Sequence, residues 1–257
     1  MRAVKTSHDD TIRRKYGFKN IISTLHFPSY APWIQARNVA RPGLWLDSAA
    51  IHRIFAGMEL DLEVKYADRA YQILASLVTP RPIALVTTMS REGNVNAAPF
   101  SFFNLMGANP PILAFAPGDR DDGTPKDTAR NIRATQEFVV NLVDEAMAEA
   151  MNKCAASLPY GENELQRAGL HAAPSSTVKP PRIAEAAASL ECVEWGTLRI
   201  GGNRVVIGLI KRVHVRDELF DVEKKRVQTE KYFVIGRMAS PHWYCRTRDR
   251  FEMIRPA

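Results

Sequence analysis

The sequence predicts a mainly β protein, an antiparallel barrel that is closed or nearly closed and carries short helices around it. About six segments have the apolar, β-branched composition of strands, and turns containing glycine and asparagine join two pairs of them into hairpins. Helical segments occur between some strands but do not alternate with them one for one. This order disfavours a doubly wound parallel sheet and favours a barrel.

Residues 1–57 are predicted to be a separate N-terminal extension without a sustained helical or strand period. They hold nine lysines and arginines against three aspartates, a net charge of +6, and the remaining residues hold 26 bases and 25 acids. The near-neutral main body argues against a nucleic-acid interface there. We expect the extension to be poorly ordered or loosely docked, or to be a start-site artefact with Met58 as the true initiator.

The main domain is predicted at residues 58–257 and begins with helical spacing in 58–74. Apolar segments at 82–88 and 95–100 form the first predicted hairpin, with Gly93 and Asn94 in its turn. A third strand is expected at 111–116.

After a polar loop, Asp127 or Thr128 can cap a short helix. A strand at 137–143 follows, and Asp144 can cap a second helix. An extended crossing loop is expected around 174–183. The segments SLECVEWGTLRI and RVVIGLIKRVHVR then form a hairpin whose turn holds Gly201, Gly202 and Asn203.

Several classes of function lose support because their motifs are absent from the sequence. It contains no GxGxxG, P-loop, HExxH or GxSxG, and its six histidines lack metal-ligand spacing, so no metal site is predicted. Cys154, Cys192 and Cys245 are widely spaced and odd in number, which indicates buried thiols in a reducing compartment. With no apolar run of 18 residues and no secretory signal, we expect a cytoplasmic protein without a membrane span.

The segment Ala97 to Asn104 is the first cluster that can carry chemistry. Pro99 cannot donate to a strand ladder, so we expect it at an edge or an end, with the chain beyond it leaving the sheet. Backbone amides, Ser101 and Asn104 would then be available to an anionic or heteroaromatic ligand. Alternatively, the phenylalanines plug the barrel end and the two polar side chains satisfy local backbone groups.

The second cluster is Lys126, Asp127 and Thr128 at a predicted helix start, where backbone amides and a lysine can attract phosphate. The alternative is an ordinary helix cap with a solvated lysine. The acidic run Asp119, Asp121 and Asp122 is expected to be a solvated loop, because no further carboxylate partner is evident.

From about Met58 to Pro256 the chain resembles the flavin reductase-like, FMN-binding split-barrel proteins, in particular the flavoredoxin branch. Five motifs in order carry the resemblance: PRPIALVTT, EGNVNAAPFSFFN, NPP before a strand, KDTARNI with EFVVNLV, and the C-terminal GRM…Y…FEMIRP. Residues 1–57 have no counterpart in this pattern.

The resemblance implies a six-stranded Greek-key split barrel that forms a homodimer and binds FMN near the subunit interface. The isoalloxazine would lie against the backbone of Ala97 to Phe100, and Ser101 and Asn104 would contact the ribityl chain or phosphate. The implied cofactor-binding residues are Arg81, Thr87, Thr88, Ala97, Ala98, Pro99, Phe100, Ser101, Asn104, Lys126, Asp127 and Thr128.

The implied function is transfer of reducing equivalents from NADH or NADPH to FMN and onward to a partner monooxygenase or another acceptor. Because flavin accepts the hydride, we nominate no catalytic nucleophile or base; backbone amides would stabilise the charge of the reduced ring. Arg237, His242 and Tyr244 would approach the electron donor; alternatively, Trp243 and Tyr244 pack on the barrel or interface.

Two other functions stay open. The first is an FMN-binding electron carrier that lacks its own NAD(P)H reductase activity. The second is a noncatalytic scaffold whose basic extension binds an acidic surface.

Overall fold

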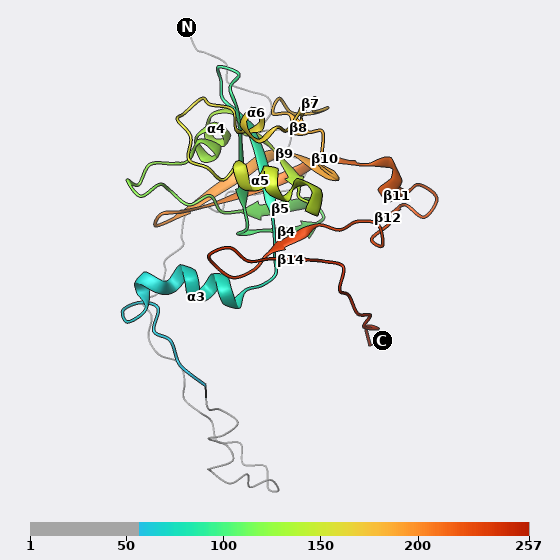
Figure 1. Cartoon of the computed structure of the whole chain (residues 1–257). Helices are drawn as coiled ribbons and strands as arrows, with labels where there is room; N and C mark the ends of the chain where they lie inside the picture. The colour runs from blue at the N-terminus through green and yellow to red at the C-terminus, as the bar shows by residue number, and fades with distance from the viewer. Residues whose placement is uncertain (1–56, 257) are drawn as a thin grey trace, which may run out of the picture. The chain divides into compact units, whose positions relative to one another are not determined.

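The computed structural model describes residues 57–256 (Figure 1). The predictions for residues 1–56 therefore lie outside the described residues. Residues Glu59–Ala257 group into one compact unit, which carries all the elements described below. Among the described helices, none has the length and apolarity needed to cross a membrane.

The main sheet has seven antiparallel strands in the order β3-β2-β6-β9-β10-β5-β4. The strands are β2 (Ala84–Met89), β3 (Val95–Phe100), β4 (Phe103–Ala108), β5 (Pro111–Phe115), β6 (Glu137–Leu142), β9 (Ala188–Ile200) and β10 (Asn203–Val215). The predicted mainly β class is confirmed, although the sheet has seven strands where about six were expected.

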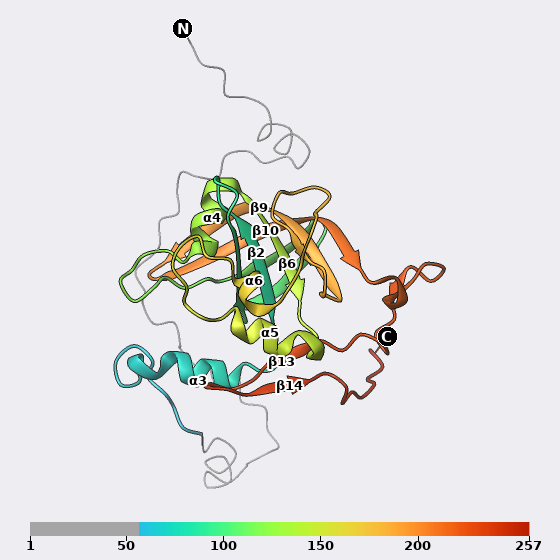
Figure 2. The ribbon, with the colours of Figure 1, turned by 45° about the horizontal axis from the view of Figure 1, so that its top comes forward.

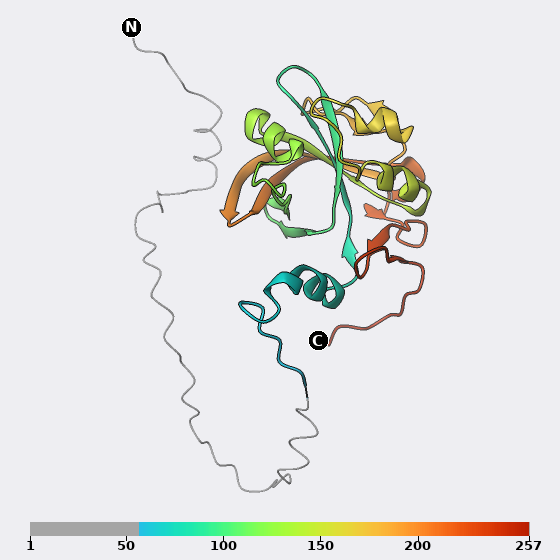
Figure 3. The same cartoon turned by 60° about the vertical axis from the view of Figure 1, so that its left-hand side comes forward.

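The edges of this sheet, β3 and β4, are consecutive in the chain and are joined only by Ser101 and Phe102. A link of this length spans at most about 11 Å between the Cα atoms of Phe100 and Phe103 at roughly 3.6 Å per residue. The sheet must therefore curl until its edges meet at this end, and Figure 3 shows the curved sheet. Strand order and the short link together produce the predicted barrel.

The prediction that the chain leaves the sheet after Pro99 is wrong. Pro99 pairs with Leu85 and Phe100 pairs with Ala84, so the ladder continues to the end of β3. Because β3 is an edge strand, Pro99 can occupy a position whose missing N–H removes no ladder bond. The prediction that Pro99 lies at an edge is confirmed.

Both predicted hairpins are confirmed. The turn between β2 and β3 contains Gly93 at φ +92°, and the turn between β9 and β10 contains Gly201 at φ +58°. Such positive φ values favour glycine, which lacks a Cβ. Gly208 of β10 has a different role, because a Cβ there would overlap the ring of Phe138 on β6.

Two apolar cores lie on opposite sides of β2, which is why every residue from Ala84 to Thr88 is buried. In one core, the Phe115 ring lies 5.3 Å from that of Phe100 and 5.4 Å from that of Phe138, centroid to centroid. The other core packs Leu85 against the helical side, including Met151 and Leu165. Cys154 and Cys192 are buried thiols, as predicted, and Cys245 is partly exposed.

The helices are α3 (Ala70–Leu77), α4 (Asp127–Thr135), α5 (Ala148–Lys153) and α6 (Glu164–Ala168), with 3-10 turns η1 (Ala67–Arg69), η2 (Glu145–Met147) and η3 (Asp217–Leu219). The predicted capping role of Asp144 is confirmed, since its Oδ1 accepts the Met147 N–H at 3.1 Å. The predicted cap of α4 is wrong: Lys126, not Asp127 or Thr128, is the N-cap residue.

Three smaller sheets complete the fold. They are β1 (Arg81–Pro82) with β13 (Ile235–Arg237) and β14 (Tyr244–Arg246), β7 (Ala172–Ala173) with β8 (Arg182–Ile183), and β11 (Phe220–Asp221) with β12 (Arg226–Val227). Figure 2 shows α3 beside β13 and β14. Arg81 connects these elements by donating to the carbonyl oxygens of Ala75, Val78 and Met238.

Candidate functional site

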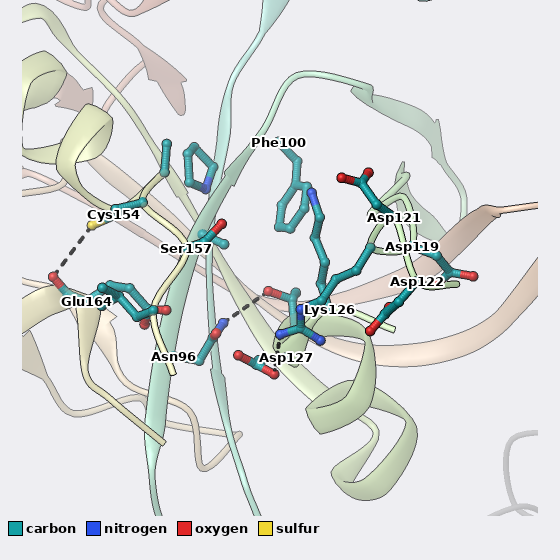
Figure 4. Close-up of a pocket in the computed structure, with 17 residues that line it drawn as sticks. Asn96, Phe100, Asp119, Asp121, Asp122, Lys126, Asp127, Cys154, Ser157 and Glu164 are labelled. Atoms are coloured by element: carbon teal, nitrogen blue, oxygen red, sulfur yellow. Dashed lines mark hydrogen bonds and ion pairs between the residues drawn. The ribbon is translucent and has the colours of Figure 1, made fainter. Parts of the chain in front are cut away.

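A pocket of about 740 Å³ lies where edge strand β3 meets the start of α4 (Figure 4). Strand β3 contributes Asn96 and Ala98 to Phe100, and the chain before and into α4 contributes residues 119–122 and 126–128. Residues 154–158 and Glu164 complete the wall. The pocket thus joins part of the first cluster, Ala98 to Phe100, to the second cluster, Lys126 to Thr128.

The β3 wall is a strand with few free backbone donors. The amide of Ala97 donates to Glu164 Oε2 at 2.9 Å, so it points away from β2. Alternation along an antiparallel strand then directs the amides of Ala98 and Phe100 toward β2, and Pro99 has no N–H. What β3 offers a ligand is its side chains and a flat edge, with the small Ala98 between Asn96 and Phe100.

A buried network of amides and hydroxyls fixes α4 against β2 and β3. Asn96 Nδ2 donates to Thr128 Oγ1 at 3.0 Å and to Thr88 Oγ1 at 3.3 Å, and Asn131 Nδ2 donates to the same Thr88 oxygen at 3.1 Å. All four side chains are buried. Buried polar groups satisfied in this way hold one arrangement of the elements that carry them.

The first turn of α4 is suited to an anion. Within the described residues no side chain caps this helix, so its first amides have no side-chain acceptor. Lys126 is exposed beside them, and Thr128 lines the pocket while its hydroxyl oxygen accepts from Asn96. Asp127 is neutralised by Arg120, whose Nη2 lies 2.9 Å from Oδ1. This donor set fits a phosphate group.

The acidic loop before α4 differs from the solvated loop that was predicted. Asp119 is largely buried and pairs with Arg204 at 2.5 Å and Arg199 at 3.8 Å, so the prediction is wrong for this residue. Asp121 and Asp122 are exposed, and Asp122 accepts hydrogen bonds from Thr124. Within residues 57–256, no cluster of three or more potential ligands is arranged to hold a metal ion.

Two groups on the remaining wall of the pocket, Cys154 and Glu164, have raised pKa values. Burial raises the pKa of the Cys154 thiol to about 11, with a further contribution from Glu164. Burial also raises the pKa of Glu164, although the Ala97 amide opposes this rise. The thiol is therefore uncharged near neutral pH and unsuited to act as a nucleophile.

Half of the twelve residues implied by resemblance line this pocket: Ala98, Pro99, Phe100, Lys126, Asp127 and Thr128. Thr87, Thr88 and Ala97 are fully buried behind it. Thr87 Oγ1 donates to the Pro181 carbonyl oxygen at 2.6 Å, and Thr88 belongs to the asparagine network.

Arg81, Ser101 and Asn104 lie outside the pocket lining. Arg81 Nε lies 3.4 Å from Ser101 Oγ, and its other nitrogens bond carbonyl oxygens. Asn104 is exposed on β4 and accepts the Leu105 N–H at 2.8 Å. Their roles toward a cofactor stay predictions.

Sequence reasoning missed Asn96, Glu164 and the segment 154–158. Asn163 before an acidic residue is a helix-start signal, and Asn163 does cap α6 through the Leu165 amide. That signal could have placed Glu164 on a helix. Nothing local indicates that this helix meets the edge of β3.

Arg237, His242 and Tyr244 lie apart from this pocket lining. The Arg237 guanidinium stacks over the Tyr244 ring at 4.6 Å, and His242 is exposed. Tyr244 lines a second cavity of about 350 Å³ between α5 and β14. Their predicted approach to an electron donor stays a prediction.

Comparison with known proteins agrees with this architecture. A family model described as a flavin reductase like domain matches residues 76–230. A relative from Deinococcus radiodurans is 44% identical over 200 residues, covering 76% of this chain and 88% of that protein.

Two solved structures are similar over most of the described unit. Nitrilotriacetate monooxygenase component B from Bacillus cereus has a TM-score of 0.73 at 32% identity, covering 77% of this chain and 98% of that chain. The 2-nitrobenzoate 2-nitroreductase NbaA from Pseudomonas fluorescens has a TM-score of 0.70 at 36% identity, covering 77% and 96%.

The curled sheet with adjacent edges is a split barrel, as the resemblance implied. The chain belongs to the flavin reductase-like family.

Proposed function

We propose that this protein is an oxidoreductase that binds FMN and transfers reducing equivalents from NADH or NADPH to the flavin and then to an acceptor. The observation that carries the proposal is the pocket that joins the β3 wall to the uncapped first turn of α4, in a member of the flavin reductase-like family. Bound flavin would supply the hydride-accepting ring, so the protein needs to supply position and electrostatics.

Different residues of this chain would bind the phosphate, form a wall for the ring and hold that wall in place. Lys126, Thr128 and the first amides of α4 would bind the phosphate. Ala98 to Phe100 would form a wall for the ring, and Asn96 would hold that wall against α4 through Thr128. We assign no protein nucleophile or general base.

A second copy of the chain is proposed as a structural partner. The β4 edge exposes Leu105 and Met106, which are 59% and 56% exposed, and nearby Phe102 contacts Tyr71 of α3 with a ring separation of 5.9 Å. Such a cluster of large apolar side chains suits a homodimer interface. A partner oxygenase is proposed as acceptor, supported by the similarity to a monooxygenase component.

The test is a titration of the purified full chain with FMN, followed by thermal unfolding and then by anaerobic mixing with NADH or NADPH. We expect FMN to raise the melting temperature and either nucleotide to bleach the bound flavin. A melting temperature that does not change when FMN is added would reject the proposal. Tight FMN binding without reduction by either nucleotide would instead identify an electron carrier reduced by a protein donor.

A further inference from the structure

Glu164 places a carboxylate in the pocket wall at the edge of β3. Glu164 is only 7% exposed, and its Oε2 accepts a hydrogen bond from the Ala97 amide at 2.9 Å. The Glu164 main-chain amide is a further donor to this carboxylate, and among the described residues no cationic side chain forms an ion pair with it. The Cys154 thiol donates to the Glu164 backbone oxygen at 3.8 Å and not to the carboxylate.

The groups that face this carboxylate do not neutralise it. Strand β3 supplies a single amide, and the end of α5 supplies the uncharged Cys154 thiol. Asp127 from α4 and Glu162 from the preceding loop are both acidic and add to the effect of burial in raising the Glu164 pKa. In Figure 4, Lys126 lies well apart from Glu164 across the pocket.

The two ends of the pocket differ in the groups that they offer to an anion. The α4 end has helix amides and Lys126, although the exposed Asp121 and Asp122 also line it, and the β3 end presents the carboxylate of Glu164 without a cation. Like charges in a partly buried site repel strongly because solvent screens them poorly. The Ala97 amide, whose backbone the family resemblance placed against the flavin ring, donates instead to this carboxylate.

We propose that Glu164 makes the pocket bind oxidised flavin more tightly than reduced flavin, so that reduced flavin is released to an acceptor. The inference rests on the proposed function. The nicotinamide gives a hydride to the flavin, which gains two electrons and one net negative charge, and the nucleotide leaves oxidised. Glu164 exchanges no electron or atom; its charge opposes the new charge on the ring.

The test compares dissociation constants of oxidised FMN and of anaerobically reduced FMN for the wild type, Glu164→Gln and Glu162→Gln. Glutamine keeps an oxygen for the Ala97 amide but removes the charge. At pH 8 we expect Glu164→Gln to strengthen binding of reduced relative to oxidised FMN by about tenfold, the effect of one pKa unit of interaction. This change raises the two-electron potential of bound flavin by about 30 mV.

Glu162→Gln is the control for a nearby charge outside the pocket, because this acid is exposed and does not line the pocket. Glu162 raises the Glu164 pKa, so its removal favours the ionised form of Glu164 and keeps the charge that the inference invokes. We expect it to keep the wild-type ratio of the two dissociation constants. Equal ratios in the wild type and Glu164→Gln would overturn the inference while leaving FMN binding intact. Failure of the wild type to bind oxidised FMN would instead reject the proposed function.

A second measurement needs no variant. As the pH falls through the raised Glu164 pKa, the carboxylate gains a proton, and the wild-type preference for oxidised FMN should diminish once the ionisation of free FMN is accounted for. A preference that is independent of pH would overturn the inference even if Glu164→Gln failed to fold.

Discussion

Two buried glutamates, Glu164 and Glu191, bind backbone amides in the same molecule and yet have opposite acidities. Glu191 on β9 is fully buried and accepts hydrogen bonds from the Ser176 and Thr177 amides at 2.7 and 2.6 Å, from the Thr177 hydroxyl at 2.5 Å and from His214 at 2.5 Å. Burial opposes its ionisation, but these donors outweigh burial and lower the pKa to about 2. Glu164 has only the Ala97 amide and its own amide as donors, and its pKa is raised.

The difference shows that the number of hydrogen-bond donors, and not burial itself, decides whether the pKa of a buried carboxylate is lowered or raised. Glu191 uses its charge to anchor the crossing loop at Ser176 and Thr177 onto the barrel. Glu164 keeps unsatisfied acceptor capacity and faces a pocket. A fully satisfied carboxylate suits an anchor, and an incompletely satisfied one suits a group that responds to a ligand.

The largest effect is expected from Glu191→Ala. It would leave two backbone amides, the Thr177 hydroxyl and His214 without their acceptor, which costs about 3 kcal/mol or more because a hydrogen bond to a charged group contributes about 1.5 to 3 kcal/mol. Urea unfolding measures this loss. Glu194→Ala, on the same strand and less buried, is the control and should cost less than about 1 kcal/mol. Similar losses in the two variants would refute the anchoring role.

The pH dependence of wild-type stability gives a second test of the difference between Glu191 and Glu164. Because the Glu191 pKa falls from 4.5 to about 2 on folding, its contribution is complete above pH 4.5 and disappears as the pH falls toward 2. The stability lost over this window, relative to Glu191→Gln, is on the order of 3 kcal/mol at 1.36 kcal/mol per pKa unit. Parallel pH profiles for the two proteins would contradict this account.

Lys126→Ala tests the other end of the pocket. Removing this cation should weaken oxidised and reduced FMN equally, by about tenfold, because it removes a charge-assisted contact to the phosphate and not to the ring. The ratio of the two dissociation constants should stay at the wild-type value. Fluorescence titration checks this, with exposed Lys153→Ala as control. An FMN affinity that is unchanged in Lys126→Ala would indicate that the phosphate binds away from this residue.

The smallest effect is expected for Glu164→Gln on the stability of the ligand-free protein. A raised folded-state pKa means that stability is present at low pH and is lost as the pH rises through that pKa. Glutamine removes this loss, so the variant should unfold at a slightly higher temperature than the wild type at pH 8 and not at pH 4. A lower melting temperature at pH 8 would indicate that the carboxylate stabilises the fold.

Local chemistry explains which parts of the fold could be predicted. The turns at Gly93 and Gly201 and the cap at Asp144 depend on neighbouring residues, and all three are present. Strand β4 was missed because Phe103–Ala108 follows β3 after two residues and pairs with β5 at the opposite edge of the sheet. That pairing depends on the curl of the whole sheet, which no local pattern encodes.

The same limit applies to the site. Ala98 to Phe100 and Lys126 to Thr128 were placed there by family resemblance, and the structure brings them to one pocket. Glu164 reaches Ala97 across 67 positions of the chain, and Glu191 binds Ser176 and Thr177 across 15 and 14 positions. Such contacts depend on how α6 and the crossing loop pack on the barrel.

The two-residue link of Ser101 and Phe102 has a consequence for how the chain can change in length. An insertion there would let the edges of β3 and β4 separate and expose two rows of unpaired backbone groups, which favour aggregation. The turn between β9 and β10 connects neighbouring strands that are already paired, so added residues would only lengthen a loop. Tolerance to insertion is therefore lowest at the link that closes the barrel and high at the tip of its longest hairpin.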